Sequence, residues 1–147
     1  MPSTLVDSGP LYALFSKKDR HHANAKAFIA RPDNQLMTTV LVVMEVVHLL
    51  RRDRLSQSKF LNWVQKALVL EPVTARDQAR IFELLAVYED LPADLADVSL
   101  VALAERLKIR RIATVDSDFQ VYRIDGKHPF ENVFWPAKGK HHTRAQT

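Results

Sequence analysis

The sequence has no cysteine, which excludes disulfide bonds, thiolate catalysis and cysteine-bound zinc. It has only three glycines, and neither a low-complexity run nor an internal repeat marks a linker between domains. The longest apolar stretch, residues 36–47, is interrupted by Glu45 and is too short to cross a bilayer. The N-terminus lacks the basic and apolar segments of a signal peptide. We therefore expect a soluble, cytoplasmic protein without a membrane segment.

The chain has the length and the apolar content of one compact domain. Its 147 residues are 47% hydrophobic, which is sufficient for a substantial core. Polar and basic residues dominate the C-terminal end. We therefore place one domain at residues 1–137 and a basic, flexible tail at residues 138–147.

Strands and helices are expected to alternate along the chain. Short apolar runs predict strands at residues 3–6, 36–38, 68–70, 111–115 and 132–134. Helical spacing and capping residues predict helices that begin near Pro10, after Asp19, and over residues 39–52, 57–67, 76–88 and 92–107. This alternation predicts an α/β fold in which a mostly parallel central sheet is covered by helices on both faces.

Acidic side chains occur in apolar surroundings at several points of this pattern. Asp7 follows the first strand, and Asp116 follows the strand at 111–115. Glu45 and Asp97 lie inside the apolar patterns of two predicted helices. A carboxylate in such a setting is costly unless a cation or hydrogen-bond donors compensate it. Because ligands gather at the carboxyl ends of parallel strands, we expect these acids to meet there and to bind Mg²⁺ or Mn²⁺ through oxygen.

Neighbouring polar residues have two interpretations each. Asp118 is a fifth candidate ligand or a cap on the following turn. Asp94 either supports the metal site or, as we favour, interacts with the dipole at the N-terminus of the helix that carries Asp97. The hydroxyls of Ser8 and Thr114 lie near the same strand ends, although such residues are more often part of simple turns.

The charge distribution indicates the class of ligand. The formal net charge is +4 in spite of the acids. Basic clusters occur at Lys17–Lys18 with Arg20, at Arg51–Arg52 with Arg54, at Arg110–Arg111 and in the tail. A basic rim around an acidic metal centre suits a phosphate-bearing polymer such as RNA, although each cluster can equally be solvated surface. The six histidines show no spacing typical of a zinc site.

Four segments together resemble the PIN-domain ribonucleases, a family that includes the VapC-type toxins of bacterial toxin–antitoxin pairs. The matching pieces are Leu5–Leu11, Glu45 in its apolar helix, Leu95–Ala104 and Ala113–Phe119. The resemblance implies a three-layer α/β/α PIN-like fold. It further implies that the acids matching Asp7, Glu45, Asp97 and Asp116 bind Mg²⁺ or Mn²⁺ for RNA hydrolysis, with a more variable role for Asp118.

We therefore predict a metal-dependent endoribonuclease, the toxin of a toxin–antitoxin system, with RNA and a small antitoxin protein as partners. A housekeeping RNA-processing nuclease and a non-catalytic RNA- or partner-binding module are the alternatives. A phosphatase-type interpretation of Asp116 and Asp118 is disfavoured, because too little chain follows for the later elements of such a site. A homodimer is expected if the helix at residues 57–67 exposes its apolar side chains; burial of these in the core is the alternative.

Overall fold

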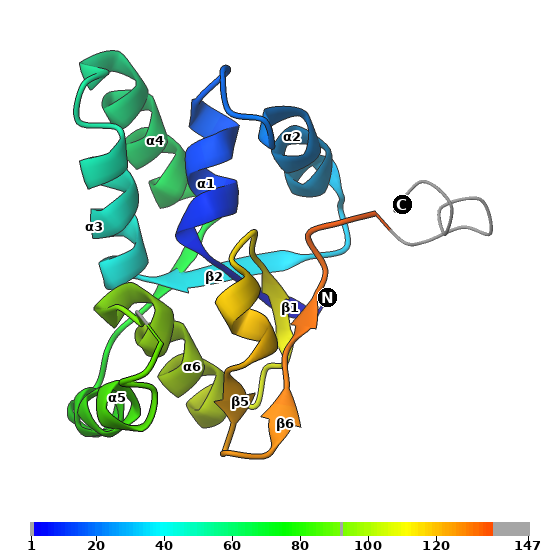
Figure 1. Cartoon of the computed structure of the whole chain (residues 1–147). Coiled ribbons are helices and arrows are strands. Elements are labelled where there is room, and N and C mark those ends of the chain that lie inside the picture. The colour runs from blue at the N-terminus through cyan, green and yellow to red at the C-terminus, as the bar shows by residue number, and fades with distance from the viewer. Residues whose placement is uncertain (1, 92, 137–147) are drawn as a thin grey trace.

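The central sheet brings the carboxyl ends of its strands to one edge. The computed structural model describes residues 2–91 and 93–136 (Figure 1). The five-stranded sheet has the order β3-β2-β1-β4-β7, and every strand pair in it is parallel. Its strands are β1 (Ser3–Val6), β2 (Gln35–Thr39), β3 (Val69–Glu71), β4 (Arg111–Ala113) and β7 (Glu131–Asn132). The predicted mostly parallel sheet is confirmed.

Helices cover both faces of this sheet. In the described part of the chain they are α1 (Ser8–Phe15), α2 (His22–Ala30), α3 (Val40–Leu49), α4 (Arg54–Ala67), α5 (Ala75–Val87) and α6 (Leu95–Leu107). Figure 1 shows α1 to α4 above the sheet and α5 and α6 below it. This arrangement confirms the three-layer α/β/α architecture.

The middle of the sheet is the centre of the hydrophobic core. Leu5 and Val6 of β1 have no exposed surface, and the same holds for Ile112 of the neighbouring β4. A strand that is covered on both faces reads as a continuous apolar run, because neither side of it faces water. The acidic residues that follow β1 and β4 therefore lie at the end of the most rigid part of the molecule.

Capping residues set helix boundaries that differ from the prediction. Asp19 was expected to cap α2, but its carboxylate accepts a hydrogen bond from the His21 amide and closes the turn before that helix. Helix α3 ends at Leu49 and not at residue 52, because Asp53 caps the new helix α4 by accepting from the Ser56 amide at 3.0 Å. The same cap starts α4 at Arg54, before the predicted start at residue 57.

The start of α6 also differs from the prediction. The helix begins at Leu95, because the Asp94 carboxylate accepts a hydrogen bond from the Asp97 amide at 2.8 Å. Pro92, the predicted first residue, lies outside the described residues. Asp97 is consequently in the first turn of α6 and not in the helix interior.

The segment after β4 contains elements that the sequence pattern missed. The strand ends at Ala113, and a 3₁₀-helix, η1 (Ser117–Gln120), follows. Strands β5 (Arg123–Ile124) and β6 (His128–Pro129) then form an antiparallel pair. Strands of two residues carry too little alternation to be recognised in a sequence. The predicted last strand is shifted, since β7 covers 131–132 and not 132–134.

Helix α4 divides its larger apolar residues between the core and the surface, where Leu55 and Leu61 are exposed. Phe60 and Val64 are buried, and Trp63 packs edge-to-face against Phe15. Leu61 is 41% exposed. The alternative of core packing is therefore correct for Phe60, Trp63 and Val64, and a homodimer stays a prediction.

Among the described residues, no helix is long and apolar enough to cross a membrane. The predicted basic tail at residues 138–147 lies outside the described residues, and the domain limits stay a prediction.

Candidate metal centre

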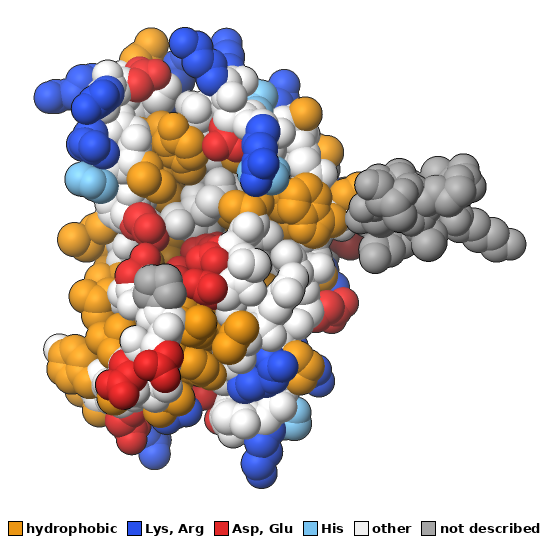
Figure 2. All heavy atoms as spheres, viewed as in Figure 1, with side chains coloured by type: hydrophobic (Ala, Val, Ile, Leu, Met, Phe, Trp, Pro, Cys, Tyr) orange, Lys and Arg blue, Asp and Glu red, His pale blue; other side chains and the backbone are white. Residues whose placement is uncertain are grey.

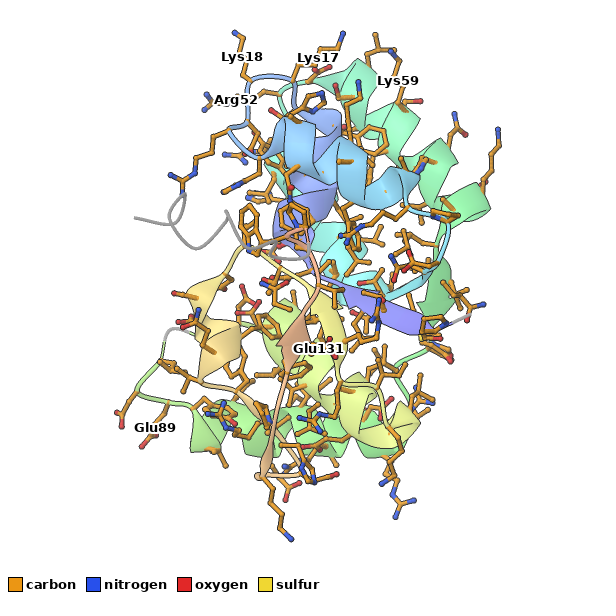
Figure 3. The ribbon with its side chains drawn as sticks, turned by 90° about the vertical axis from the view of Figure 1, so that its right-hand side faces the viewer. Lys17, Lys18, Arg52, Lys59, Glu89 and Glu131 are labelled. Atoms are coloured by element: carbon orange, nitrogen blue, oxygen red, sulfur yellow. The ribbon has the colours of Figure 1, made fainter. Side chains whose placement is uncertain are left out.

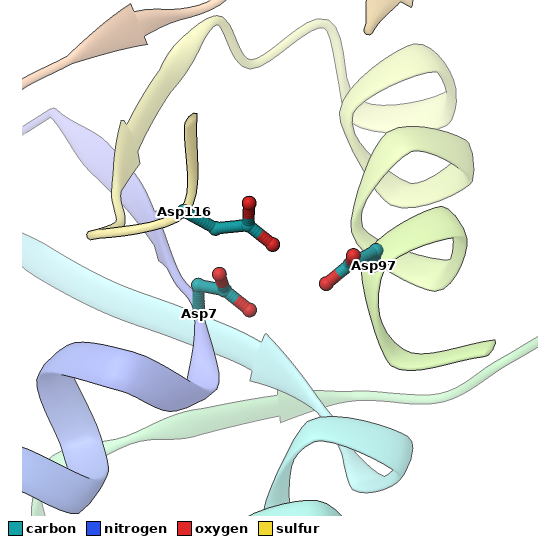
Figure 4. A group of neighbouring side chains, drawn as sticks. All are labelled: Asp7, Asp97 and Asp116. Carbon is teal, nitrogen blue, oxygen red and sulfur yellow. The ribbon is translucent and has the colours of Figure 1, made fainter. Parts of the chain in front are cut away.

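Three aspartates converge at the carboxyl edge of the sheet. Asp7, Asp97 and Asp116 each offer a carboxylate oxygen, and these oxygens lie within 4.8 Å of one another (Figure 4). They come from the end of β1, the first turn of α6 and the segment after β4. Asp7 and Asp97 are buried, and Asp116 is half-buried. The geometry matches the expectation that Asp7 and Asp116 project from adjacent strand ends.

The position of Asp7 follows from its place between a strand and a helix. Val6 pairs with Ala113 in the sheet, and the Asp7 amide donates to the Ala113 carbonyl at 3.0 Å. Its carboxylate then caps α1 by accepting from the Ser8 amide at 2.8 Å. A side chain at Gly9 would place its Cβ 2.4 Å from Val115 Cγ2, so glycine permits the close approach of α1 to the segment that carries Asp116.

Thr114 joins two of the acids directly. Its hydroxyl donates to Asp7 Oδ2 at 2.8 Å and accepts from the Asp116 amide at 2.9 Å. Asn132 holds the Thr114 backbone in turn, because its side chain accepts from the Thr114 amide and donates to the Thr114 carbonyl. Thr114 is thus more than a turn residue, since it connects the Asp7 carboxylate to the Asp116 backbone.

Tyr122 supports the third aspartate and was not predicted from the sequence. Its hydroxyl donates to Asp97 Oδ2 at 3.1 Å, and its ring has no exposed surface. The ring packs edge-to-face against Tyr88 and Phe119, with ring centroids 4.9 Å apart in both pairs. No motif contains Tyr122, because η1 and the following turn bring it back to α6.

The structure assigns positions to Asp94 and Asp118, the two acids for which the sequence left alternatives. Asp94 is the N-cap of α6, which confirms the favoured interpretation of a helix-terminus residue. Asp118 was considered as a cap, but the capping group is the carboxylate of Asp116, which accepts from the Asp118 amide at 2.9 Å. Within the described residues, Asp118 is not one of the carboxylates in the close group.

Glu45 lies beside this group without joining it. It is half-buried in the middle of α3, and it is not among the described carboxylates whose oxygens lie within 4.8 Å of one another. Its Oε1 is buried and has no hydrogen-bond partner in the part of the chain that the structure describes. Burial raises the pKa of Glu45, and the negative charge of Asp94 raises it further. A buried carboxylate oxygen without a donor is satisfied by a cation or a proton.

The electrostatics of the aspartates favour a bound cation. Burial raises the pKa of Asp7 to about 7, against the lowering effect of the hydrogen bonds from Thr114 and Ser8. Burial and the charge of Asp7 raise the pKa of Asp97 to about 8. Charged forms of these acids are therefore costly near neutral pH in the metal-free protein. A set of hard oxygen donors with this unbalanced charge fits Mg²⁺ or Mn²⁺.

Basic side chains gather at one end of the molecule. Figure 2 shows acidic side chains in the middle of one face, with lysine and arginine side chains clustered above them. A cavity of about 890 Å³ is lined by Lys17, Lys18, Arg51, Arg52 and Lys59, among other residues. Figure 3 shows Lys17, Lys18, Arg52 and Lys59 at the same end. Two of the predicted basic clusters thus form one surface.

The predicted cluster at Arg110–Arg111 has a different role. Arg111 is part-buried and donates to Thr4 Oγ1 at 3.2 Å and to Asn34 Oδ1 at 2.7 Å. Arg110 donates to the Pro129 carbonyl. Both arginines precede or begin β4, at the opposite edge of the sheet from the aspartates. The contacts of Arg111 tie strands and loops together, which favours structural support over RNA contact for this residue, whereas Arg110 is exposed.

Solved structures of low sequence identity share this fold. VapC20 from Mycobacterium tuberculosis, described as a sarcin–ricin loop cleaving toxin, is 23% identical with a TM-score of 0.74, covering 86% of this chain and 99% of that one. VapBC2 from Rickettsia felis, bound to a promoter DNA fragment, gives 15% identity and a TM-score of 0.64, and the match covers 88% of this chain and 98% of that one. A toxin–antitoxin complex from Klebsiella pneumoniae gives 21% identity and a TM-score of 0.57, and the match covers 78% of this chain and 87% of that one. Identities this low establish the fold alone.

The sequence itself identifies the family. No curated protein matches the chain significantly in sequence. The family model of the PIN domain, however, matches residues 4–125, which include all the acids described above. The resemblance expected from the sequence is confirmed, and the chain belongs to the PIN-domain family.

Proposed function

We propose that this protein is a metal-dependent endoribonuclease that hydrolyses RNA phosphodiester bonds and acts as the toxin of a toxin–antitoxin pair. The observation that carries this proposal is the convergence of the Asp7, Asp97 and Asp116 carboxylates within 4.8 Å at the carboxyl edge of the sheet. Membership of the PIN-domain family and the similarity to VapC20, a toxin that cleaves RNA, support it.

Asp7, Asp97 and Asp116 would hold the Mg²⁺ or Mn²⁺ ion, and Glu45 would be the fourth acid of the site. Such a cation makes a bound water more acidic and stabilises the leaving oxygen of a phosphodiester. Thr114 holds the Asp7 carboxylate and the Asp116 backbone, and Tyr122 orients the Asp97 carboxylate. Because the pKa values of Asp7 and Asp97 are raised, cation binding near neutral pH displaces protons from these acids.

The basic surface has the chemistry to hold the RNA backbone. Lys17, Lys18, Arg51 and Arg52 line one cavity, and in the described part of the chain none of them forms a salt bridge. Lysine and arginine without acidic partners attract phosphates and make binding depend on salt concentration. The acidic centre alone would repel RNA, so this surface supplies the attraction.

The alternative of a non-catalytic module predicts that the acids form structural ion pairs. The salt bridges among the described residues join Arg80 to Glu83 and Glu105, and Arg106 to Asp77, away from the acidic centre. Ion pairing therefore does not account for the burial of Asp7 and Asp97, and this observation favours the metal-binding alternative.

The nuclease activity is tested with purified protein and single-stranded RNA. We expect cleavage with Mn²⁺ or Mg²⁺ and loss of cleavage with EDTA. Asp116→Asn removes a proposed ligand and should abolish the activity, whereas Asp118→Asn changes a neighbouring acid outside the close group and should reduce the activity by about tenfold at most. Cleavage by wild type that persists in EDTA would refute the metal-dependent mechanism.

The toxin role requires a separate test in cells. VapBC2 and the Klebsiella complex contain toxin and antitoxin together, and we propose a small antitoxin as a partner here in the cytoplasm. Expression of the chain alone should arrest growth, the Asp116→Asn variant should be harmless, and co-expression of the small protein encoded beside it should restore growth. Harmless expression of an active nuclease would favour a housekeeping role in RNA processing.

A further inference from the structure

A second, smaller cavity opens directly beside the metal centre. Its volume is about 290 Å³, and Thr114 and Asp116 form part of its wall. Both residues also belong to the acidic centre, where the Thr114 hydroxyl accepts from the Asp116 amide. A molecule in this cavity would therefore be in contact with the segment that carries a proposed metal ligand.

Three aromatic rings contribute to the other walls of this cavity. Phe119 and Phe130 pack edge-to-face with ring centroids 5.4 Å apart, and both line it. Trp135 lines it as well and is 46% exposed. Its volume is at the lower end of the range of about 300–1,000 Å³ for small-molecule sites, which suits one planar ring system.

The two side-chain amides that line the cavity differ in whether they are free to hydrogen-bond to a ligand. Both ends of the Asn132 amide are engaged by the Thr114 backbone. Gln120 is exposed, and no hydrogen bond of its side chain occurs among the described residues. Gln120 thus offers a donor and an acceptor close to the aromatic walls, the combination that recognises the edge of a nucleobase.

We propose that this cavity binds one unstacked base of the RNA next to the bond cleaved at the metal centre, and so sets a sequence preference at that position. The inference rests on the proposed nuclease function. Trp135 stacks on the base, because aromatic rings are the usual platform for single-stranded bases. Gln120 reads the edge of the base.

The position of the cavity also suits the path of an RNA strand. The Trp135 ring lies 5.5 Å from the ring of His21, measured between centroids. The next residue, His22, lines the basic cavity together with Lys17 and Lys18. A strand with one base in the aromatic cavity can therefore extend its backbone past His21 toward the basic surface, which joins two features of the molecule into one binding path.

Fluorescence tests the base site without requiring cleavage. The chain has two tryptophans, so Trp63→Phe leaves Trp135 as the sole tryptophan, which can be excited selectively at about 295 nm or above, where tyrosine absorbs little. We expect a short single-stranded oligoribonucleotide, added with Ca²⁺, to quench Trp135 in a saturable manner, and an oligomer with an abasic site at the bound position to quench less. Wild-type-like melting of Trp63→Phe is the control, and absence of quenching by an oligomer that binds in a separate filter assay would overturn the proposal.

Cleavage of a randomised RNA tests the sequence preference. Wild type should show a preferred base at one position beside the cut, and Gln120→Ala should reduce that preference about tenfold. Gln78→Ala, an exposed glutamine on α5, is the matched control and should keep the wild-type preference. An unchanged preference in both Gln120→Ala and Trp135→Leu would overturn the base site. Absence of cleavage by wild type would refute the nuclease function itself, and the fluorescence result then decides the base site.

Discussion

The Tyr122 hydroxyl donates a 3.1 Å hydrogen bond to Asp97 Oδ2 from a completely buried ring. This bond lowers the pKa of Asp97 against the raising effect of burial and of the neighbouring acids. Tyr122→Phe removes the hydroxyl and keeps the ring, so the pKa of Asp97 should rise above about 8. Fewer molecules would then carry an ionised Asp97 at neutral pH, and metal binding would weaken.

We expect Tyr122→Phe to shift the acidic limb of the pH–activity profile to higher pH. The loss of one hydrogen bond should also lower the free energy of unfolding by about 1 kcal/mol. Cleavage rates measured from pH 5.5 to 9 at fixed Mn²⁺ give the shift, and rates at saturating Mn²⁺ separate metal affinity from turnover. Identical profiles for variant and wild type would show that Tyr122 only fills space.

Amide substitutions test each proposed ligand. Asp7→Asn, Glu45→Gln, Asp97→Asn and Asp116→Asn should each reduce RNA cleavage by more than about 100-fold, the upper range for residues that merely support a ligand. Asp118→Asn should cost about tenfold or less, because its carboxylate is outside the close group. Circular dichroism verifies the fold of each variant, and near-normal activity in any of the four removes that residue from the site.

The basic surface predicts a dependence of RNA binding on salt. Arg52→Glu should weaken binding across RNA sequences and reduce the slope of log affinity against log salt by about 0.7 or more, the value per phosphate contact for single strands. Charge reversal at Arg51 or Arg54 should act in the same direction. The matched control is Arg76→Glu, an exposed arginine on α5 in the opposite layer of the fold. Binding is measured with Ca²⁺ present, and a flat salt response in wild type would contradict the assigned role.

Much of the fold could be predicted because its elements have strong local signals. The run Leu5–Val6 is apolar on both sides, as expected for a buried central strand. Asp7 and Asp116 could be placed together because parallel strands end at one edge. In contrast, Tyr122 lies 25 residues after Asp97 and follows a 3₁₀-helix. The apolar periodicity of a sequence does not predict that the chain folds back to make such a contact.

The local sequence also does not predict which basic residues are exposed. Arg111 and Arg52 have the same charge and similar basic neighbours in the sequence, but only Arg52 is exposed. Arg111 instead bonds to Thr4 and Asn34, which are distant in sequence. Composition predicts a basic surface, whereas tertiary contacts decide which arginines belong to it.

The raised pKa values of Asp7 and Asp97 predict how the stability of the metal-free protein depends on pH. Below about pH 4 both acids are protonated in the folded and the unfolded states, so they impose no penalty. Between that pH and the folded-state pKa values of about 7 and about 8, the unfolded state loses these protons first. The folded state then binds more protons, so the free energy of unfolding falls as pH rises and the penalty is complete above about pH 8. In EDTA, we expect this contribution to lower the melting temperature from pH 5.5 to pH 8.5.

Thermal melts of Asp97→Asn and Asp77→Asn distinguish an aspartate whose buried charge lowers stability from one whose charge is stabilised by an ion pair. Asp97→Asn removes a costly buried charge, so at pH 8.5 in EDTA it should melt at or above the wild-type temperature, and its pH dependence should be flatter. Asp77 is also buried, but it accepts hydrogen bonds from Arg106, so Asp77→Asn should lower the free energy of unfolding by about 1–3 kcal/mol. Mn²⁺ should raise the melting temperature of wild type and of Asp77→Asn but have little effect on Asp97→Asn, because only the first two keep all the proposed ligands. A lower melting temperature for Asp97→Asn in EDTA, with no shift by Mn²⁺ in wild type, would show that the three aspartates are structural and do not form a metal site.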